Sequence, residues 1–261
     1  MIHEVKPEAD NSLKGESKKP LISVVTIVLN GEKCLEETIQ SVIRNKTEET
    51  EYLIIDGGSV DNTLEIIRKY SDKIDFWISE PDGGIADAFN KGFKYSSGRY
   101  IAYLNSDDYY LPGALSSVIP MLKDPGTIYC GHIHLLTPDG LNIIKDQLSQ
   151  PWRIKQTMRI AHPATFTPRE AFIATGGFLS DYKIAMDYDF MVHAFLKGFR
   201  FEIMDVFIAG MRRGGNSSDL KTVYKEELKI KNKRFGYKIQ HYIWYLLNLA
   251  RYLVMPKKAI V

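Results

Sequence analysis

Cysteine is scarce in this chain of 261 residues, which contains only Cys34 and Cys130. Two cysteines cannot form a disulfide framework, and their spacing matches no zinc motif. A reduced, cytosolic environment is therefore expected. The first 20 residues also lack an apolar core, so they do not form a signal peptide. We expect residues 1–20 to be a mobile leader of a cytoplasmic protein.

Net charge is also small, because 34 Lys and Arg balance 32 Asp and Glu to a formal +2. This balance does not indicate a nucleic-acid partner, and we expect none. The charge is nevertheless uneven. Residues 221–261 contain ten Lys and Arg against two Glu, so the tail is basic and the rest of the chain is mildly acidic.

The sequence does contain a regular alternation of apolar runs and amphipathic segments. Residues 21–29 form a nearly unbroken β-branched run, which is typical of a strand covered on both faces. Further strands are predicted at residues 51–56, 74–79 and 100–104, with helices around residues 35–43, 61–70 and 85–93. Such alternation predicts an α/β fold with a parallel sheet and right-handed crossovers.

Polar residues follow three of these strands, at the point where each strand ends: Asn30, Asp56 and residues 105–108. The carboxyl ends of parallel strands meet at one edge of a sheet, where ligands bind in open α/β folds. We therefore expect these side chains to share one crevice. The paired acids Asp107 and Asp108 repel each other and favour a bound cation, although a simple polar loop is the alternative.

The second half of the chain has a mixed pattern. Residues 128–135 and 141–145 flank a Thr-Pro-Asp-Gly turn, which predicts a hairpin. Helices are predicted around residues 168–175 and 187–197, and two strands at residues 199–205 and 207–211. We expect this half to pack against the first half.

The tail predicts a basic helix at residues 220–235 and an apolar helix at residues 239–255. The second is shorter than the roughly 20 apolar residues of a membrane-spanning helix. Its flanking lysines and its tyrosines suit a helix that lies in a membrane interface. A helix packed on the protein core or on a homodimer partner remains the alternative.

Five motifs, in this order, resemble the family 2 glycosyltransferases with the GT-A fold: SVVTIVLNGEKCLEETIQSV, YLIIDGGSVDNT, SEPDGGIADAFNKGF, GRYIAYLNSDDYYLP and GGF…AMDYDF. The resemblance covers residues 21–218. It implies a Rossmann-like nucleotide-sugar-binding half with a mostly parallel sheet at residues 21–112. A mixed acceptor half follows at residues 113–218, and residues 219–261 form a basic, amphipathic helical extension.

The resemblance also implies a divalent cation, Mn²⁺ or Mg²⁺, which bridges the diphosphate of the donor. The family motif of acid, any residue, acid reads Asn105-Ser106-Asp107 here. Asp107 is the expected metal ligand, and Asp108 assists through water or holds the loop. Asn105 replaces the first acid and is expected to bind a ribose or a metal-bound water.

Asp56 matches the family acid that binds the nucleotide base, while Gly57 stands where a second acid is usual. A plain turn former is the alternative for Asp56. The resemblance adds four donor contacts, at Thr26, Asn30, Asp82 and Lys91. An ordinary solvated helix charge is an equally good interpretation of Lys91.

An acceptor hydroxyl needs a base to take its proton. Asp187 matches the family base, with Met186 in place of the usual preceding Glu, and Asp189 is the substitute candidate. A helix N-cap is the alternative for Asp187. One base and one metal imply direct displacement with inversion. Arg213 is expected near the diphosphate, whereas His162 is expected to be structural.

The resemblance thus implies a metal-dependent hexosyl- or N-acetylhexosaminyltransferase that moves a sugar from a nucleoside-diphosphate sugar, expected to be UDP-linked. The acceptor would be a glycan or a polyprenyl- or lipid-linked glycan of the cell surface, reached from the inner face of the membrane. A catalytically weak, membrane-associated scaffold is one alternative. A sugar-phosphate nucleotidyltransferase would need a glycine-rich, lysine-containing loop, which residues 28–33 are not, and a dehydrogenase would need G-x-G-x-x-G.

Overall fold

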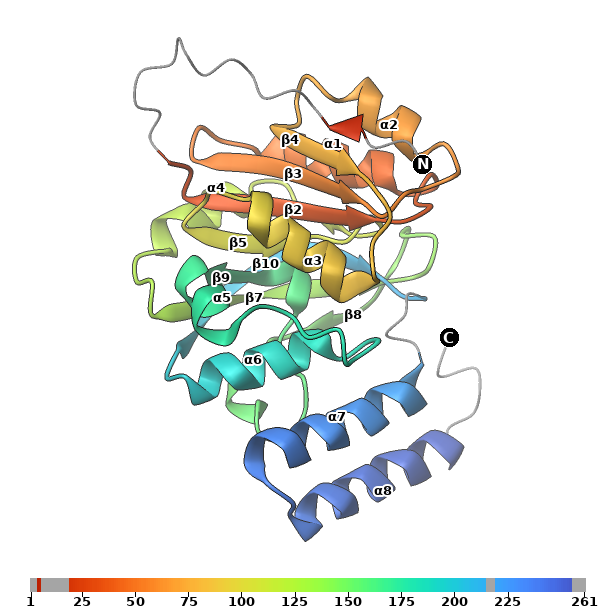
Figure 1. The fold of residues 1–261 in the computed structure, drawn as a ribbon, viewed down its shortest axis with the longest axis vertical. Helices are drawn as coiled ribbons and strands as arrows, with labels where there is room; N and C mark the ends of the chain where they lie inside the picture. The colour runs from red at the N-terminus through yellow and green to blue at the C-terminus, as the bar shows by residue number, and fades with distance from the viewer. Residues whose placement is uncertain (1–3, 6–18, 215–218, 255–261) are drawn as a thin grey trace.

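One ten-stranded sheet organises the computed structural model, which describes residues 4–5, 19–214 and 219–254 (Figure 1). Its first half contains four neighbouring parallel strands in the order β4-β3-β2-β5. Their bounds are Ile22–Val28 for β2, Thr50–Asp56 for β3, Phe76–Ser79 for β4 and Tyr100–Tyr103 for β5. The predicted parallel α/β half is therefore confirmed.

Part of the expected leader belongs to this sheet. Strand β1 (Glu4–Val5), within the segment expected to be a mobile leader, pairs antiparallel with β4. Residues 1–3 and 6–18 of the leader lie outside the described residues.

Helices cover both faces of the sheet, and this explains the unbroken apolar runs. Val24 and Ile54 belong to the core on the face of α1, whereas Val25 and Ile55 belong to the core on the face of α3. Each such buried side chain contributes roughly 1.5–3 kcal/mol. The helices of this half are α1 (Leu35–Asn45), α2 (Thr63–Lys69), α3 (Ile85–Tyr95) and α4 (Ala114–Val118), the last continued by a 3₁₀ turn at Ile119–Met121.

The second half extends the same sheet. Strand β9 (Thr165–Pro168) lies antiparallel between β5 and β7 (Thr127–Leu136), and β10 (Arg200–Arg212) runs parallel to β7. Strand β6 (Tyr109–Tyr110) pairs antiparallel with β10. The predicted hairpin is confirmed, because β8 (Ile143–Gln147) pairs antiparallel with β7.

The prediction of two strands at residues 199–205 and 207–211 was wrong. They form the single strand β10, whose pairing with β7 shifts register between Ile203 and Phe207 and again before Ala209. Extra residues on one strand make such a bulge and break the apolar alternation. That local irregularity near Asp205 produced the false gap between strands.

Helices α6, α7 and α8 lie below this second half in Figure 1. Helix α5 (Arg169–Thr175) and the largely buried α6 (Met186–Leu196) cover the sheet, with 3₁₀ turns at Pro151–Arg153 and His162–Ala164. Helix α7 (Leu220–Phe235) packs beside α6, and α8 (Ile239–Val254) packs beside α7. Within the described ranges, none of the helices has the length and hydropathy needed to cross a bilayer.

Candidate active site

A cavity of about 800 Å³ opens at the carboxyl ends of β2 and β5. Six of the residues predicted from the sequence line it: Asn30, Asp82, Asn105, Asp107, Asp108 and Asp187. They come from four separate segments of the chain. The expected convergence of strand ends on one crevice is therefore found for Asn30 and residues 105–108, but not for Asp56, which does not line the cavity.

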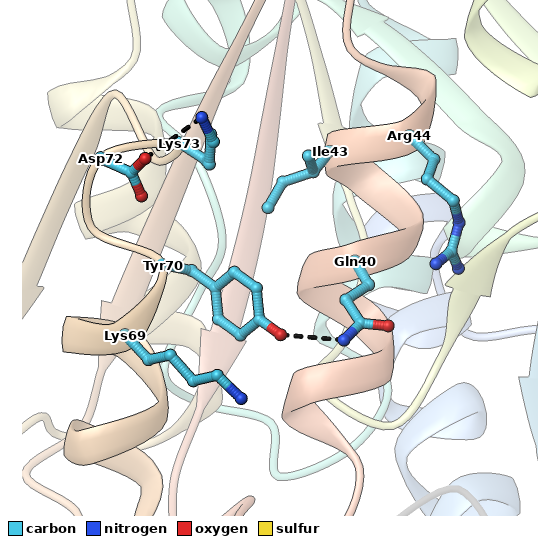
Figure 2. A pocket seen from close by; sticks show the side chains of 7 residues that line it. All are labelled: Gln40, Ile43, Arg44, Lys69, Tyr70, Asp72 and Lys73. Atoms are coloured by element: carbon cyan, nitrogen blue, oxygen red, sulfur yellow. Dashed lines mark hydrogen bonds and ion pairs between the residues drawn. The ribbon is translucent and has the colours of Figure 1, made fainter.

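A second hollow, of about 330 Å³, lies between α1 and α2 (Figure 2). Several of its polar groups bond to one another: Gln40 donates to the Tyr70 hydroxyl at 2.8 Å, and Lys73 pairs with Asp72 at 3.1 Å. It brings together none of the predicted site residues. The larger cavity is therefore the candidate site.

Four predicted site residues are not among the described residues that line the cavity: Thr26, Asp56, Lys91 and Arg213. Thr26 is buried and accepts a hydrogen bond from the Tyr52 hydroxyl at 3.1 Å. Lys91 pairs with Glu80 at 2.9 Å and donates to the Pro81 carbonyl at 3.0 Å.

Asp56 is fully buried and acts on the site through its neighbours. Its carboxylate accepts hydrogen bonds from the Ser59 hydroxyl at 2.5 Å and the Ser79 hydroxyl at 2.6 Å. Ser59 in turn accepts a hydrogen bond from the Asn30 backbone N–H at 2.7 Å. Asn30 has a positive φ of 53°, and its side-chain oxygen accepts from the Val60 N–H at 2.9 Å. The turn-forming contacts of Asp56 thus fix Asn30 at the cavity.

Asp82 occupies the space that a side chain at position 57 would fill. A Cβ built on Gly57 would overlap the Asp82 carboxylate. The carboxylate also accepts a hydrogen bond from the Gly84 N–H at 2.8 Å. Burial raises the pKa of Asp82, and the charges of Asp87 and Asp56 add to this while Lys91 opposes it. An acid is therefore present beside Gly57, but it comes from the loop after β4.

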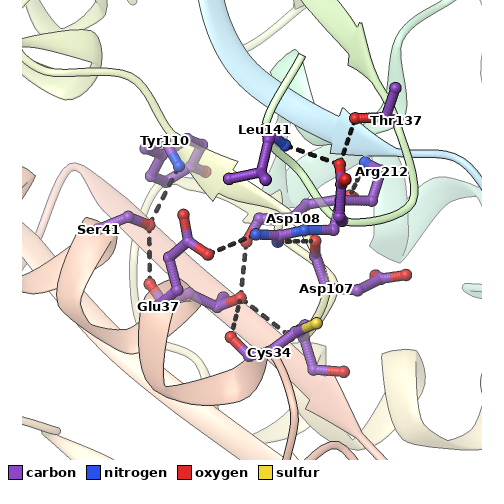
Figure 3. A network of polar contacts seen from close by, with 12 residues as sticks. Cys34, Glu37, Ser41, Asp107, Asp108, Tyr110, Thr137, Leu141 and Arg212 are labelled. Carbon is purple, nitrogen blue, oxygen red and sulfur yellow. Dashed lines mark hydrogen bonds and ion pairs between the residues drawn. The ribbon is translucent and has the colours of Figure 1, made fainter. Parts of the chain in front are cut away.

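The Asp107–Asp108 loop is held by Arg212, at the end of β10 (Figure 3). The Arg212 guanidinium donates to the Asp107 carbonyl at 2.5 Å and pairs with Glu37 of α1. The Arg212 backbone N–H donates to the Asp108 carboxylate at 3.1 Å, and the Thr38 hydroxyl donates to the Asp108 carbonyl at 2.6 Å. Asp108 therefore holds the loop.

The two adjacent acids have different environments. Burial raises the pKa of Asp108 well above its usual range, and the neighbouring charge of Asp107 adds to this effect. Burial also raises the pKa of Asp107, opposed by the positive charge of Arg212. Asp107 is only partly covered, so its carboxylate is the one that lies open to the cavity.

The described residues contain no cluster of three or more His, Cys, Asp or Glu side chains that could hold a metal ion. A single carboxylate, that of Asp107, nevertheless fits a bound Mg²⁺ or Mn²⁺, because substrate phosphates and waters usually provide the remaining ligands of such a cation. Arg212 was missed from the sequence, where Arg213 was chosen instead. The strand pattern of β10 could have distinguished the two arginines, because neighbouring residues of a strand point to opposite faces of the sheet.

Asp187 lies in the first turn of α6, and the N-cap is Ala185, so the N-cap alternative for Asp187 was wrong. Its pKa is raised to about 6, chiefly by burial, with the charge of Glu226 adding to the effect. The Tyr188 N–H donates to the carboxylate at 2.7 Å and opposes this shift. A carboxylate with this pKa is well placed for general base catalysis near neutral pH.

Asp189, the substitute candidate, is 1% exposed and does not line the described cavity. Arg234 of α7 donates to both of its oxygens, at 2.9 and 2.6 Å. A carboxylate bound by a guanidinium through both oxygens has a structural role. Asp187 is therefore the carboxylate of α6 that faces the cavity.

His162 was expected to be structural, and its ring does pack against Phe89 and Tyr103, with ring centroids 5.3 and 5.7 Å away. It also lines the cavity. Burial lowers its pKa to about 4, so the ring is neutral at physiological pH. Among the described residues, none forms a hydrogen bond with the ring nitrogens.

Comparison with known proteins agrees with this geometry. Residues 23–188, more than half of the chain, match the model of glycosyl transferase family 2. A hyaluronan synthase of Pasteurella multocida is 31% identical over 180 residues, which are 66% of this chain. This chain spans only 18% of that protein's length.

Solved structures share the fold. S. aureus TarS in complex with UDP-GlcNAc superposes with a TM-score of 0.63 at 18% identity, over 91% of this chain and 74% of that one. A mannosyltransferase of Pyrobaculum calidifontis in complex with GDP-Man and Mn²⁺ gives a TM-score of 0.61 at 13% identity, over 92% and 77%. With the family match and the strand-end cavity, these likenesses identify the chain as a member of glycosyl transferase family 2 with the GT-A fold.

Proposed function

We propose that this protein is an inverting, metal-dependent glycosyltransferase that uses a nucleoside-diphosphate sugar, expected to be UDP-linked. The observation that carries the proposal is the single cavity that contains both Asp107 and Asp187. The nucleotide sugars bound by TarS and by the mannosyltransferase support a donor of this class. The likeness to a hyaluronan synthase supports a glycan acceptor and a role in cell-surface polysaccharide or glycolipid synthesis.

In this proposal the strand ends bind the donor. Asn30 and Asp82 contact the nucleoside, and Asp56 acts through Ser59 to hold Asn30 in place. Asp107 would hold Mn²⁺ or Mg²⁺, and Asn105 would bind a ribose or water beside it. The cation, when bound, neutralises the charge that develops on the leaving diphosphate. We keep Thr26, Lys91 and Arg213 as weaker candidates for donor contacts, since they do not line the described cavity.

Asp187 is the proposed general base. It takes the proton of the acceptor hydroxyl while that oxygen bonds to the anomeric carbon and the bond from that carbon to the diphosphate oxygen breaks. Displacement in one step inverts the configuration at the anomeric carbon. The engagement of Asp189 with Arg234 supports this single-base scheme, because Asp189 is not available as a covalent nucleophile. His162 offers one donor and one acceptor to a sugar hydroxyl.

We further propose that α8 lies at an anionic membrane surface, on the inner face of the cell membrane, next to a polyprenyl- or lipid-linked acceptor. Its exposed apolar side chains recur at helical spacing, at Ile239, Ile243, Leu246, Leu247 and Leu253. The tail that contains them is basic. Anionic vesicles should bind the protein, and replacing Ile243 and Leu247 with Glu should abolish this binding. A concentration-dependent dimer without vesicle binding would favour a second copy as the partner.

Transfer assays with a panel of nucleotide sugars and Mn²⁺ test the function. Asp107→Asn and Asp187→Asn should each abolish transfer, whereas Asp72→Asn, an exposed acid of the second hollow, should leave it unchanged. Donor binding without transfer by the wild type would support the scaffold alternative. Formation of a nucleotide sugar from a nucleoside triphosphate and a sugar phosphate would instead indicate a nucleotidyltransferase.

A further inference from the structure

Helix α7 reaches the candidate base through Glu226. The Glu226 carboxylate accepts hydrogen bonds from three consecutive backbone N–H groups, those of Lys183, Ile184 and Ala185, at 2.8, 3.0 and 2.9 Å. These residues come immediately before α6, and Asp187 is the second residue of that helix. A side chain from the tail thus holds the segment that leads into the candidate base.

Glu226 brings a negative charge to a helix N-terminus that has no polar N-cap side chain. The first N–H groups at a helix N-terminus lack partners within the helix, and a polar N-cap side chain usually binds one of them. The N-cap of α6 is Ala185, which has no polar side chain. Glu226, which comes from another helix, accepts instead from the N–H of Ala185 and from the two N–H groups before it, and its negative charge lies at the positive end of the α6 dipole.

A second contact fixes the same turn from the other side. Arg234, two helical turns after Glu226, binds both oxygens of Asp189. Between them Ile230 is fully buried in the core that includes the apolar residues of α6. Helix α7 therefore holds the start of α6 at Ala185 and at Asp189, which lie two residues before and two residues after Asp187.

We propose that Glu226 is a positioning residue for the transfer reaction, which sets the backbone before Asp187 and hence the placement of its carboxylate in the cavity. This inference rests on the proposed role of Asp187 as the base. It gives α7, which lies after the part of the chain that matches the family model, a function in catalysis. A base displaced by about 1 Å loses up to roughly 100-fold in rate.

The test compares Glu226→Ala and Glu226→Gln with Lys233→Ala as the matched control. Lys233 also lies on α7 and pairs at 3.3 Å with Asp181, in the same loop but away from residues 183–185. We expect Glu226→Ala to lower kcat by about 10- to 100-fold with the donor KM little changed. Glu226→Gln, which keeps one acceptor oxygen, should fall between Glu226→Ala and the wild type. Lys233→Ala should match the wild type.

A wild-type kcat in folded Glu226→Ala, or in Glu226→Gln should the alanine variant fail to fold, would overturn the proposal. A rise in donor KM with unchanged kcat would do the same. Comparison of the single variants Glu226→Ala and Asp187→Asn separates this inference from the proposed function. Transfer that survives Asp187→Asn would refute the base itself, whereas an inactive Asp187→Asn beside a fully active Glu226→Ala would refute only the positioning role.

Discussion

The two acids in the first turn of α6 should respond in opposite ways to the same substitution. Asp187→Asn is expected to abolish transfer and to stabilise the folded protein at neutral pH. The folded-state pKa of Asp187 is about 6, above the ordinary value of 3.8. Between these two values the folded chain keeps a proton that the unfolded chain has lost. The stability contributed by Asp187 therefore falls as pH rises through this window and is lowest above pH 6.

The size of the effect follows from the shift. One pKa unit corresponds to about 1.36 kcal/mol, so a shift from 3.8 to about 6 gives an upper limit of ~3 kcal/mol. Asp187 is partly open to the cavity, and water there reduces the cost of its charge. We therefore expect Asp187→Asn to gain about 1–2 kcal/mol above pH 6 and to gain nothing below pH 3.8.

Asp189→Asn provides the contrast, because Asp189 is 1% exposed and binds Arg234 through both oxygens. Removing its charge leaves a half-buried guanidinium without its counter-ion and should cost about 3–5 kcal/mol. Urea unfolding of the wild type and both variants at pH 7.5 and 3.5 measures these differences. The reasoning would be refuted by an Asp187→Asn variant that is no more stable than the wild type at pH 7.5, or by a gain that persists at pH 3.5.

Three further substitutions test the rest of the cavity. Gly57→Asp should weaken donor binding in a titration, because the new side chain overlaps the Asp82 carboxylate. Adding Asp82→Gly should restore part of the affinity, and an unchanged affinity of the Gly57→Asp variant would contradict this packing. Arg212→Lys should lower stability to urea by about 1–3 kcal/mol and raise the Mn²⁺ concentration needed for transfer, since lysine has one nitrogen in place of the two guanidinium nitrogens that bind the Asp107 carbonyl and Glu37. His162→Phe keeps the aromatic packing and should raise the donor KM about fivefold, the value of one hydrogen bond, with an unchanged melting temperature; an unchanged KM would make the residue purely structural.

The architecture could be predicted from the sequence because it depends on local patterns. The unbroken apolar run at β2 indicated a strand covered on both faces, and Val24 and Val25 do lie in opposite cores. The site residues that follow β2 and β5 were predictable for a related reason, since parallel strands bring their carboxyl ends to one edge. The cavity contains both Asn30 and Asp107, as this rule requires.

Other parts of the site depend on which side chain of a distant element fills a space, and local patterns do not record this. Gly57 indicated that the second acid usual in the family is missing, but the carboxylate of Asp82, from another loop, occupies the space that a side chain at position 57 would fill. Arg213 was chosen from its motif, whereas the guanidinium that binds the Asp107 carbonyl and Glu37 is that of Arg212, and contacts between such distant elements leave no local pattern. The basic tail suggested a surface for partners, yet Arg234 binds Asp189 of α6 and Glu226 binds the residues just before that helix.

The Asp-Tyr-Asp spacing in α6 shows why such a site needs its neighbours to be interpreted. Two carboxylates two residues apart on a helix point to different sides, and the spacing alone does not say which of them is free. Helix α7 makes the difference, because Arg234 neutralises Asp189 while Glu226 adds a negative charge near Asp187. Arg234 thus binds one acid, whereas burial, with a smaller contribution from Glu226, raises the pKa of the other. The proposed general base is thus distinguished from its neighbour by residues some forty positions later in the chain than the motif that contains it.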